Sequence, residues 1–107
     1  MANTFKNALA RNVGTSASTI YTAPSSTKSI CIELDVCNTS GSGVTCDAYI
    51  TSGGNDYYIV KGAPVPVGGS LQVVAGQKIV LADTDALKVL SSAATSLDVI
   101  ASILEDV

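Results

Sequence analysis

The segment that decides the fold of this chain is Ser29-Ile30-Cys31-Ile32-Glu33-Leu34-Asp35-Val36-Cys37-Asn38. Apolar side chains alternate along it with polar ones or cysteines. One face would carry Ile30, Ile32, Leu34 and Val36, and the other would carry Cys31, Glu33, Asp35 and Cys37. A period of two over this length indicates a β-strand with one buried face. We therefore expect residues 29–38 to form a strand whose aliphatic face packs into the core.

A second alternating segment, residues 44–51, follows after a polar loop rich in glycine, residues 39–43. Two such segments joined by a short loop predict a β-hairpin. A register with Asn38 opposite Val44 places the apolar faces of both strands on the same side, which is how register is usually fixed. We expect the two strands to be neighbours in one sheet.

The three cysteines are Cys31, Cys37 and Cys46. In the expected register Cys46 points into the core, whereas Cys31 and Cys37 point away from it. Those two lie roughly 20 Å apart at a rise of ~3.3 Å per residue, and a disulfide needs Cα atoms within about 7 Å. We expect free thiols that act as small packing residues.

The rest of the chain also consists of short β-prone segments separated by Gly, Ser, Asn and Pro. Residues 85–90 also fit a short helix with Asp85 as its N-cap, but the strand interpretation is favoured. About eight short strands predict an all-β fold, a single antiparallel β-sandwich or jelly-roll domain over residues 1–107. Residues 1–13 are expected to form an extended N-terminal arm or a strand exchanged with a neighbour.

Composition excludes several classes of function. Six Lys and Arg face nine Asp and Glu, which gives a net charge of −3, and nucleic-acid binding needs clustered basic residues. The absence of His removes Ser-His-Asp and Cys-His catalytic pairs and His-ligated metals. The sequence shows no signal peptide and no apolar run long enough to span a bilayer. We expect no catalytic residues, no cofactor, no metal, no nucleic-acid partner and no membrane contact.

The charge content indicates a subunit. Charged residues make up 14% of the chain and hydrophobic residues 47%, whereas soluble domains average roughly 25% charged residues. A small domain with so few charges exposes apolar surface that neighbouring subunits would cover.

Acidic side chains occur in pairs, but none makes a convincing site. Asp83-Thr84-Asp85 and Asp56 are better explained as solvated turn residues than as calcium ligands. Glu33 and Asp35 lie two residues apart on one strand, whereas glycosidase carboxylates flank a cleft from opposite sides. We interpret the pair as solubilising charges.

Tyr49, Tyr57 and Tyr58 offer an alternative function, a platform for stacking a sugar. Adjacent strand residues face opposite ways, so at most two of the three can share a face. The alternative hypothesis is therefore a carbohydrate-binding module of a phage receptor-binding tail appendage.

The order of the segments resembles that of small virion proteins of tailed bacteriophages, particularly cyanophage-like ones. The similarity lies in the segments Thr19–Pro24, Ser29–Asn38, Val44–Ile50, Tyr57–Leu71, Lys78–Val89 and Leu97–Glu105. It implies a non-enzymatic β-sandwich structural protein that decorates or joins parts of the particle as a capsid cement, neck or tail protein. It implies other virion proteins as partners and the virion, assembled in the host bacterial cytoplasm, as the location.

The symmetry of phage particles leads us to expect a homo-oligomer. The N-terminal segment and the outer face of the last strand are the expected contact surfaces. The contact residues that we predict are Phe5, Leu9, Val13, Ile100 and Leu104.

Overall fold

The computed structural model describes residues 4–105, with residues 76 and 77 described for their backbone alone. Within this range the chain forms eight β-strands and no helix. The strands are β1 (Thr4–Val13), β2 (Ser18–Thr22), β3 (Ser29–Asn38), β4 (Val44–Ser52), β5 (Asn55–Val65), β6 (Ser70–Leu81), β7 (Ala86–Ser91) and β8 (Leu97–Glu105). The prediction of an all-β chain is confirmed, and the segment that also fitted a helix forms β7.

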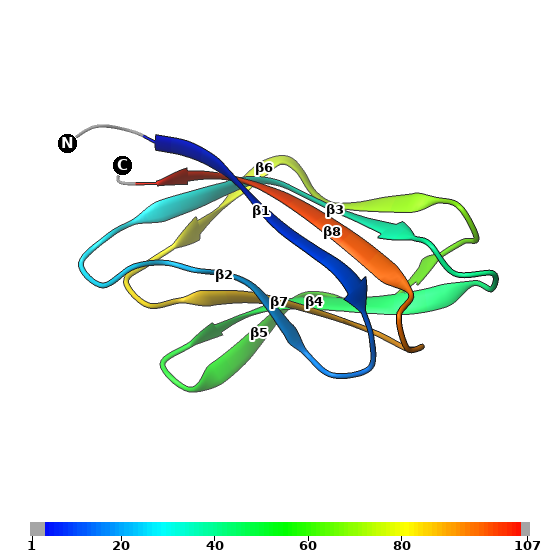
Figure 1. Ribbon diagram of the computed structural model, residues 1–107. Helices are drawn as coiled ribbons and strands as arrows, with labels where there is room; N and C mark the ends of the chain where they lie inside the picture. The colour runs from blue at the N-terminus through cyan, green and yellow to red at the C-terminus, as the bar shows by residue number, and fades with distance from the viewer. Residues whose placement is uncertain (1–3, 106–107) are drawn as a thin grey trace.

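The strands make two antiparallel sheets packed face to face (Figure 1). The first sheet has the order β1-β8-β3-β6, and the second has the order β2-β7-β4-β5. Strands pair from the two ends of the chain inward: β1 with β8, β2 with β7, β3 with β6, and β4 with β5. This is the pairing of one long hairpin rolled into a double sheet, the jelly roll. The predicted sandwich or jelly roll is therefore confirmed.

The core lies between the sheets and is aliphatic. Its largest fully buried apolar side chains are Leu34, Leu81, Leu87, Leu97 and Ile103. Both sheets contribute, because Leu87 belongs to β7 and the other four belong to the first sheet. Burying one such side chain contributes roughly 1.5–3 kcal/mol, so the interior of the sandwich is the main source of its stability.

β3 contains a bulge that the alternating sequence does not reveal. Cys31 pairs with Ile103 of β8, and Glu33 pairs with Ser102, the residue next to Ile103. Ile32 is therefore an additional residue on β3. A bulge of this kind reverses the side-chain alternation on its far side.

The bulge corrects the predicted faces of β3. Cys31 is fully buried in the core, not on the outer face, and Ile30 points outward. Beyond the bulge Leu34 and Val36 point inward as expected. The strand itself was correctly predicted, but its inward and outward faces are exchanged before the bulge and as predicted after it.

The predicted hairpin between β3 and β4 is wrong, because these strands lie in different sheets. The loop between them crosses the end of the sandwich, and Asn38, which is buried, holds its path. The Asn38 Nδ2 group donates to the carbonyls of Ser42, at 2.8 Å, and Val65, at 3.0 Å, and its Oδ1 accepts from the Ser40 amide at 2.9 Å. These hydrogen bonds satisfy the buried amide of Asn38 and stabilise the loop that carries the chain from one sheet to the other.

The N-terminal segment is a strand of the sandwich. Residues 4–13 form β1, paired with β8 at the edge of the first sheet, and residues 1–3 lie outside the described range. Whether β1 is exchanged with a neighbour stays a prediction. Near its end Asn12 has a φ of 58°, and the register with β8 shifts. This irregularity turns Val13 into the core, where it is 2% exposed, so its assignment to a contact surface is corrected.

Candidate assembly surface

Apolar side chains form a row across the outer face of the first sheet. Phe5 lies opposite Leu104, Leu104 lies opposite Ile30, and Ile30 lies opposite Val80. The row thus crosses all four strands. Phe5, at its β1 end, is 75% exposed.

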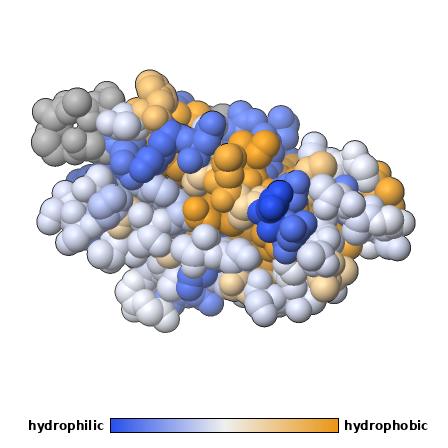
Figure 2. Space-filling model, viewed as in Figure 1, coloured by the Kyte–Doolittle hydropathy of each residue, from blue (hydrophilic) through white to orange (hydrophobic). Residues whose placement is uncertain are grey.

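A second apolar pair lies on the same face. Leu9 of β1 is directly opposite Ile100 of β8, and the two side chains are 67% and 52% exposed. We call Phe5, Leu9, Ile30, Val80, Ile100 and Leu104 the apolar face. Figure 2 shows hydrophobic surface over β1 and β8, with a strongly hydrophilic patch beside it near the end of β1.

The structure brings together four of the five predicted contact residues, Phe5, Leu9, Ile100 and Leu104. Their role as contacts stays a proposal. Sequence reasoning missed Ile30 and Val80. From the sequence, Ile30 is expected in the core, because apolar and polar residues alternate through the bulge at Ile32 as they would in a regular strand.

A shallow cleft of about 340 Å³ lies beside the apolar pair, lined by Leu9, Ala10, Arg11, Asp98, Val99 and Ile100. The acidic residue of the cleft, Asp98, accepts a hydrogen bond at its Oδ1 from the backbone amide of Asn12 at 3.2 Å. This bond ties the irregular end of β1 to β8 beside the cleft, which Arg11 also lines.

Two carboxylates lie on the same face of β3, Glu33 between the row and the pair and Asp35 in line with the pair. Glu33 lies opposite Ser102, and Asp35 lies opposite Ile100. Burial, and then the hydrogen bond and charge of Glu33, raise the pKa of Asp35 to about 6. The Oδ1 atom of Asp35 is buried without a hydrogen-bond partner. The pair is therefore less solvated than the solubilising charges that we expected.

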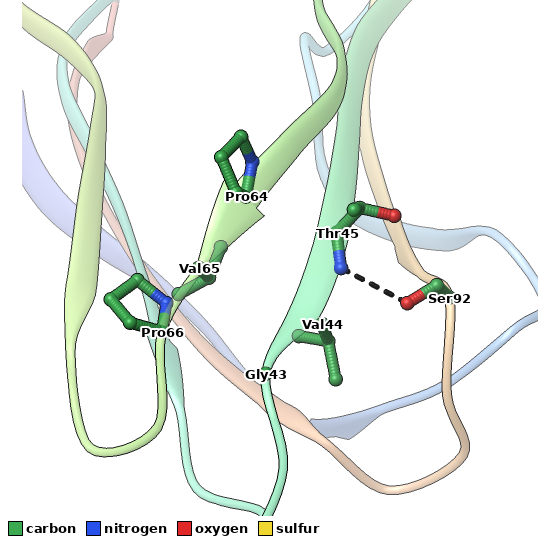
Figure 3. A pocket seen from close by; sticks show the side chains of 7 residues that line it. All are labelled: Gly43, Val44, Thr45, Pro64, Val65, Pro66 and Ser92. Carbon is green, nitrogen blue, oxygen red and sulfur yellow. Dashed lines mark hydrogen bonds between the residues drawn. The ribbon is translucent and has the colours of Figure 1, made fainter.

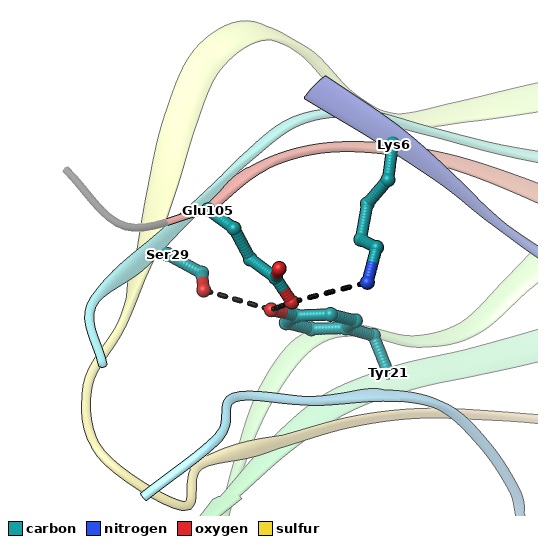
Figure 4. Close-up of polar contacts among 4 residues, drawn as sticks. All are labelled: Lys6, Tyr21, Ser29 and Glu105. Carbon is teal, nitrogen blue, oxygen red and sulfur yellow. Dashed lines mark hydrogen bonds and ion pairs between the residues drawn. The ribbon is translucent and has the colours of Figure 1, made fainter. Parts of the chain in front are cut away.

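A polar cluster closes one end of the sandwich near the start of β1 (Figure 4). The Glu105 carboxylate accepts a hydrogen bond from the Tyr21 hydroxyl and faces Lys6 Nζ at 3.4 Å. Tyr21 also meets the buried Ser29 hydroxyl at 2.8 Å. A carboxylate only accepts, so Tyr21 donates to Glu105 and accepts from Ser29. Burial, followed by the bond to Glu105, raises the pKa of Tyr21 to about 12, and the cluster joins β1, β2, β3 and β8.

A second cleft, of about 560 Å³, is mainly apolar (Figure 3). It is lined by Gly43, Val44, Thr45, Pro64, Val65, Pro66 and Ser92. The Thr45 amide donates to Ser92 Oγ at 3.0 Å. The lining contains no ionisable side chain, so it offers no group for acid–base or nucleophilic chemistry.

The tyrosines do not form a flat stacking platform. Tyr49 and Tyr58 pack with ring centroids 4.8 Å apart at a tilt of 37°, but Tyr49 is only 6% exposed. Lys61 lies over the Tyr58 ring, with its Nζ 4.4 Å from the ring centroid. Tyr57 lies opposite Ile50, on the other face of its strand. The geometry thus gives no specific support to the sugar-binding alternative.

The cysteines and acidic turns show no metal site. All three thiols are free, and Cys31 and Cys46 are buried. Burial raises the pKa of both to about 11. Asp85 Oδ2 accepts the Ala82 amide at 3.0 Å within its own turn. In residues 4–105 no group of three or more His, Cys, Asp or Glu side chains is placed to hold a metal ion. The same residues contain no helix that is long and apolar enough to cross a membrane.

Solved structures with a fold similar to that of this chain include a pilus protein and viral proteins. A subunit from the disulfide-linked pili of Bacillus endospore appendages matches 97% of this chain and 87% of its own, with a TM-score of 0.58 and 14% identity. Two chains of infectious bursal disease virus particles match at TM-scores of 0.49 and 0.45, with 12% and 11% identity. These matches include 98% and 96% of the present chain, but only 30% of each viral chain. No protein-family model and no curated protein matches the sequence.

These neighbours are structural components of a pilus and of a viral particle. At 14% identity the match to the pilus subunit shows a shared fold alone. The viral matches are too distant to add to the argument.

Proposed function

We propose that this protein is a non-enzymatic structural subunit that assembles with copies of itself and with other particle proteins. The apolar face is the observation that carries the proposal. Isolated apolar side chains are normal on a protein surface, but a set aligned across the strands of one sheet is characteristic of an interaction site. Burial of this face in an assembly would remove its exposed apolar area from water.

The particle that we propose is the virion of a tailed bacteriophage. The segment order resembles that of small virion proteins, and the low charge content suits a subunit enclosed by neighbours. The protein would serve as a capsid cement, neck or tail component and would enter the virion in the host bacterial cytoplasm. The jelly roll, which is also common in viral capsid proteins, is compatible with this role.

The proposal is tested by placing charges on the apolar face. The double variant Leu9→Lys/Ile100→Lys adds two lysines at neighbouring exposed positions. We expect it to sediment as a smaller species than the wild type at the same concentration, because a buried lysine pair opposes association. Sedimentation velocity measures this directly.

The matched control adds the same two charges to the second sheet. Thr22 and Asn55 are both exposed there, so Thr22→Lys/Asn55→Lys should sediment like the wild type. An equal loss of association in both variants would attribute the effect to net charge and would refute the role of the apolar face.

A further inference from the structure

The sandwich has four strand edges, and three of them carry features that prevent pairing with another chain. Edge strands expose unpaired backbone groups, and proteins protect them with short strands, Pro residues and bulges. β2 has five residues and an irregular register. β5 contains Pro64, and Gly62 within it has a φ of 67°. β6 pairs irregularly with β3 at two places and contains Lys78 at a φ of 53°.

β1 lacks these protections over most of its length. It pairs with β8 in an uninterrupted register from Thr4 to Ala10, with neither Gly nor Pro in that stretch. Among the described residues β8 is its only strand neighbour (Figure 1). The charge of Lys6 is matched by Glu105 at 3.4 Å, so it does not repel an incoming strand. The start of β1 is also fixed by the cluster around Tyr21, which makes this edge an ordered one.

The sequence of β1 is complementary to itself in the antiparallel direction. If two copies pair with Asn7 opposite Asn7, then Phe5 of each copy lies opposite Leu9 of the other. Apolar pairs across neighbouring strands stabilise a sheet. Because Phe5 also faces Leu104 and Leu9 faces Ile100, this register joins the apolar face of one copy to that of the second. Lys6 then lies opposite Ala8, so no two charges are directly opposed.

We propose that two copies of this chain associate through antiparallel pairing of their β1 strands about a two-fold axis at Asn7, giving one continuous eight-stranded sheet. The inference rests on the proposed function, since it names the partner and the register of the assembly. The interface is isologous, with the same strand used by both copies. It is independent of which other particle proteins the dimer then contacts.

Site-directed cross-linking tests the register. Directly opposite residues in an antiparallel pair have Cα atoms about 4.5–5.5 Å apart, which lies within the range that a disulfide bridges. In a Cys37→Ser background, which removes the partly exposed native thiol, Asn7→Cys should form a covalent dimer under mild oxidation. Leu9→Cys is the matched control, because two copies of Leu9 would be roughly 13 Å apart, four residues at ~3.3 Å each. A mixture of Phe5→Cys and Leu9→Cys chains should cross-link between unlike copies.

Each outcome decides the inference. Rapid cross-linking of Asn7→Cys without cross-linking of Leu9→Cys supports the two-fold register. Equal cross-linking of Asn7→Cys and Leu9→Cys overturns it, and so does the absence of cross-linking by Asn7→Cys. An arrangement in which β1 is exchanged into a neighbour is among the alternatives that these results would leave. The mass of the same samples before oxidation separates the two proposals. An oligomer without the Asn7 cross-link refutes this interface alone, whereas a monomer refutes the proposed self-assembly as well.

Discussion

Asp35 is the residue whose environment departs furthest from what its sequence position suggests. It lies on the outer face of β3, opposite Ile100 and near Glu33. A carboxylate on an outer strand face is ordinarily solvated, yet one oxygen of Asp35 is buried without a partner. Its neighbours on the adjoining strands are Ile100 and Gln72, and burial beside them disfavours the charged carboxylate, so ionisation carries a cost.

This cost predicts a pH dependence of stability. The folded pKa of Asp35 is about 6, against an ordinary 3.8, so the folded chain retains a proton that the unfolded chain has lost. The free energy of unfolding should therefore fall as pH rises from about 4 to about 6 and then level off. Asp35→Asn should flatten this slope and raise the free energy of unfolding at pH 7 by roughly 1 kcal/mol, because partial exposure to solvent screens most of the ~3 kcal/mol that the full shift would give at about 1.4 kcal/mol per pKa unit.

Chemical denaturation between pH 4 and pH 8 measures the effect. Glu33→Gln is the matched control: it removes the neighbouring charge but not the burial, which is the larger cause, so it should retain part of the slope. An unchanged slope in Asp35→Asn would show that another group titrates.

At the scale of elements, the position of β3 was predictable and its faces were only partly so. Alternation is a local property, and it located β3 with its observed bounds. The parity of β3 depends on the extra residue at Ile32, and that bulge is defined by its pairing with β8 and β6. No local pattern encodes these partners, which are distant in the sequence. The same limit explains the wrong hairpin, since sheet membership of β4 is decided by its pairing with β5 and β7.

Thiol labelling tests the bulge. Cys37 is partly exposed, whereas Cys31 and Cys46 are buried with pKa values near 11. Because the thiolate is the reactive form, a maleimide should label Cys37 in the folded protein and label the other two only after unfolding. Mass spectrometry of digested samples identifies the labelled sites. Labelling of Cys31 as fast as Cys37 would restore the uninterrupted alternation and contradict the bulge.

At the scale of the whole molecule, composition predicted a subunit but not the geometry of its surface. The low charge content indicated exposed apolar area. It did not reveal that β1 and β8, from opposite ends of the chain, are neighbours and place Leu9 opposite Ile100. The jelly roll supplies that juxtaposition, because its pairing joins the two ends of the chain. Four residues of the candidate site were thus predictable singly, but their arrangement on one face of the sheet was not.

A role as an assembly subunit requires that this chain associate with itself, and its mass in solution measures that association. Light scattering of the purified full chain over a wide range of concentrations gives the mass without a standard for shape. We expect a dimer or a larger symmetric oligomer whose mass is a whole multiple of the 10.8 kDa chain. A monomer at every concentration would contradict it.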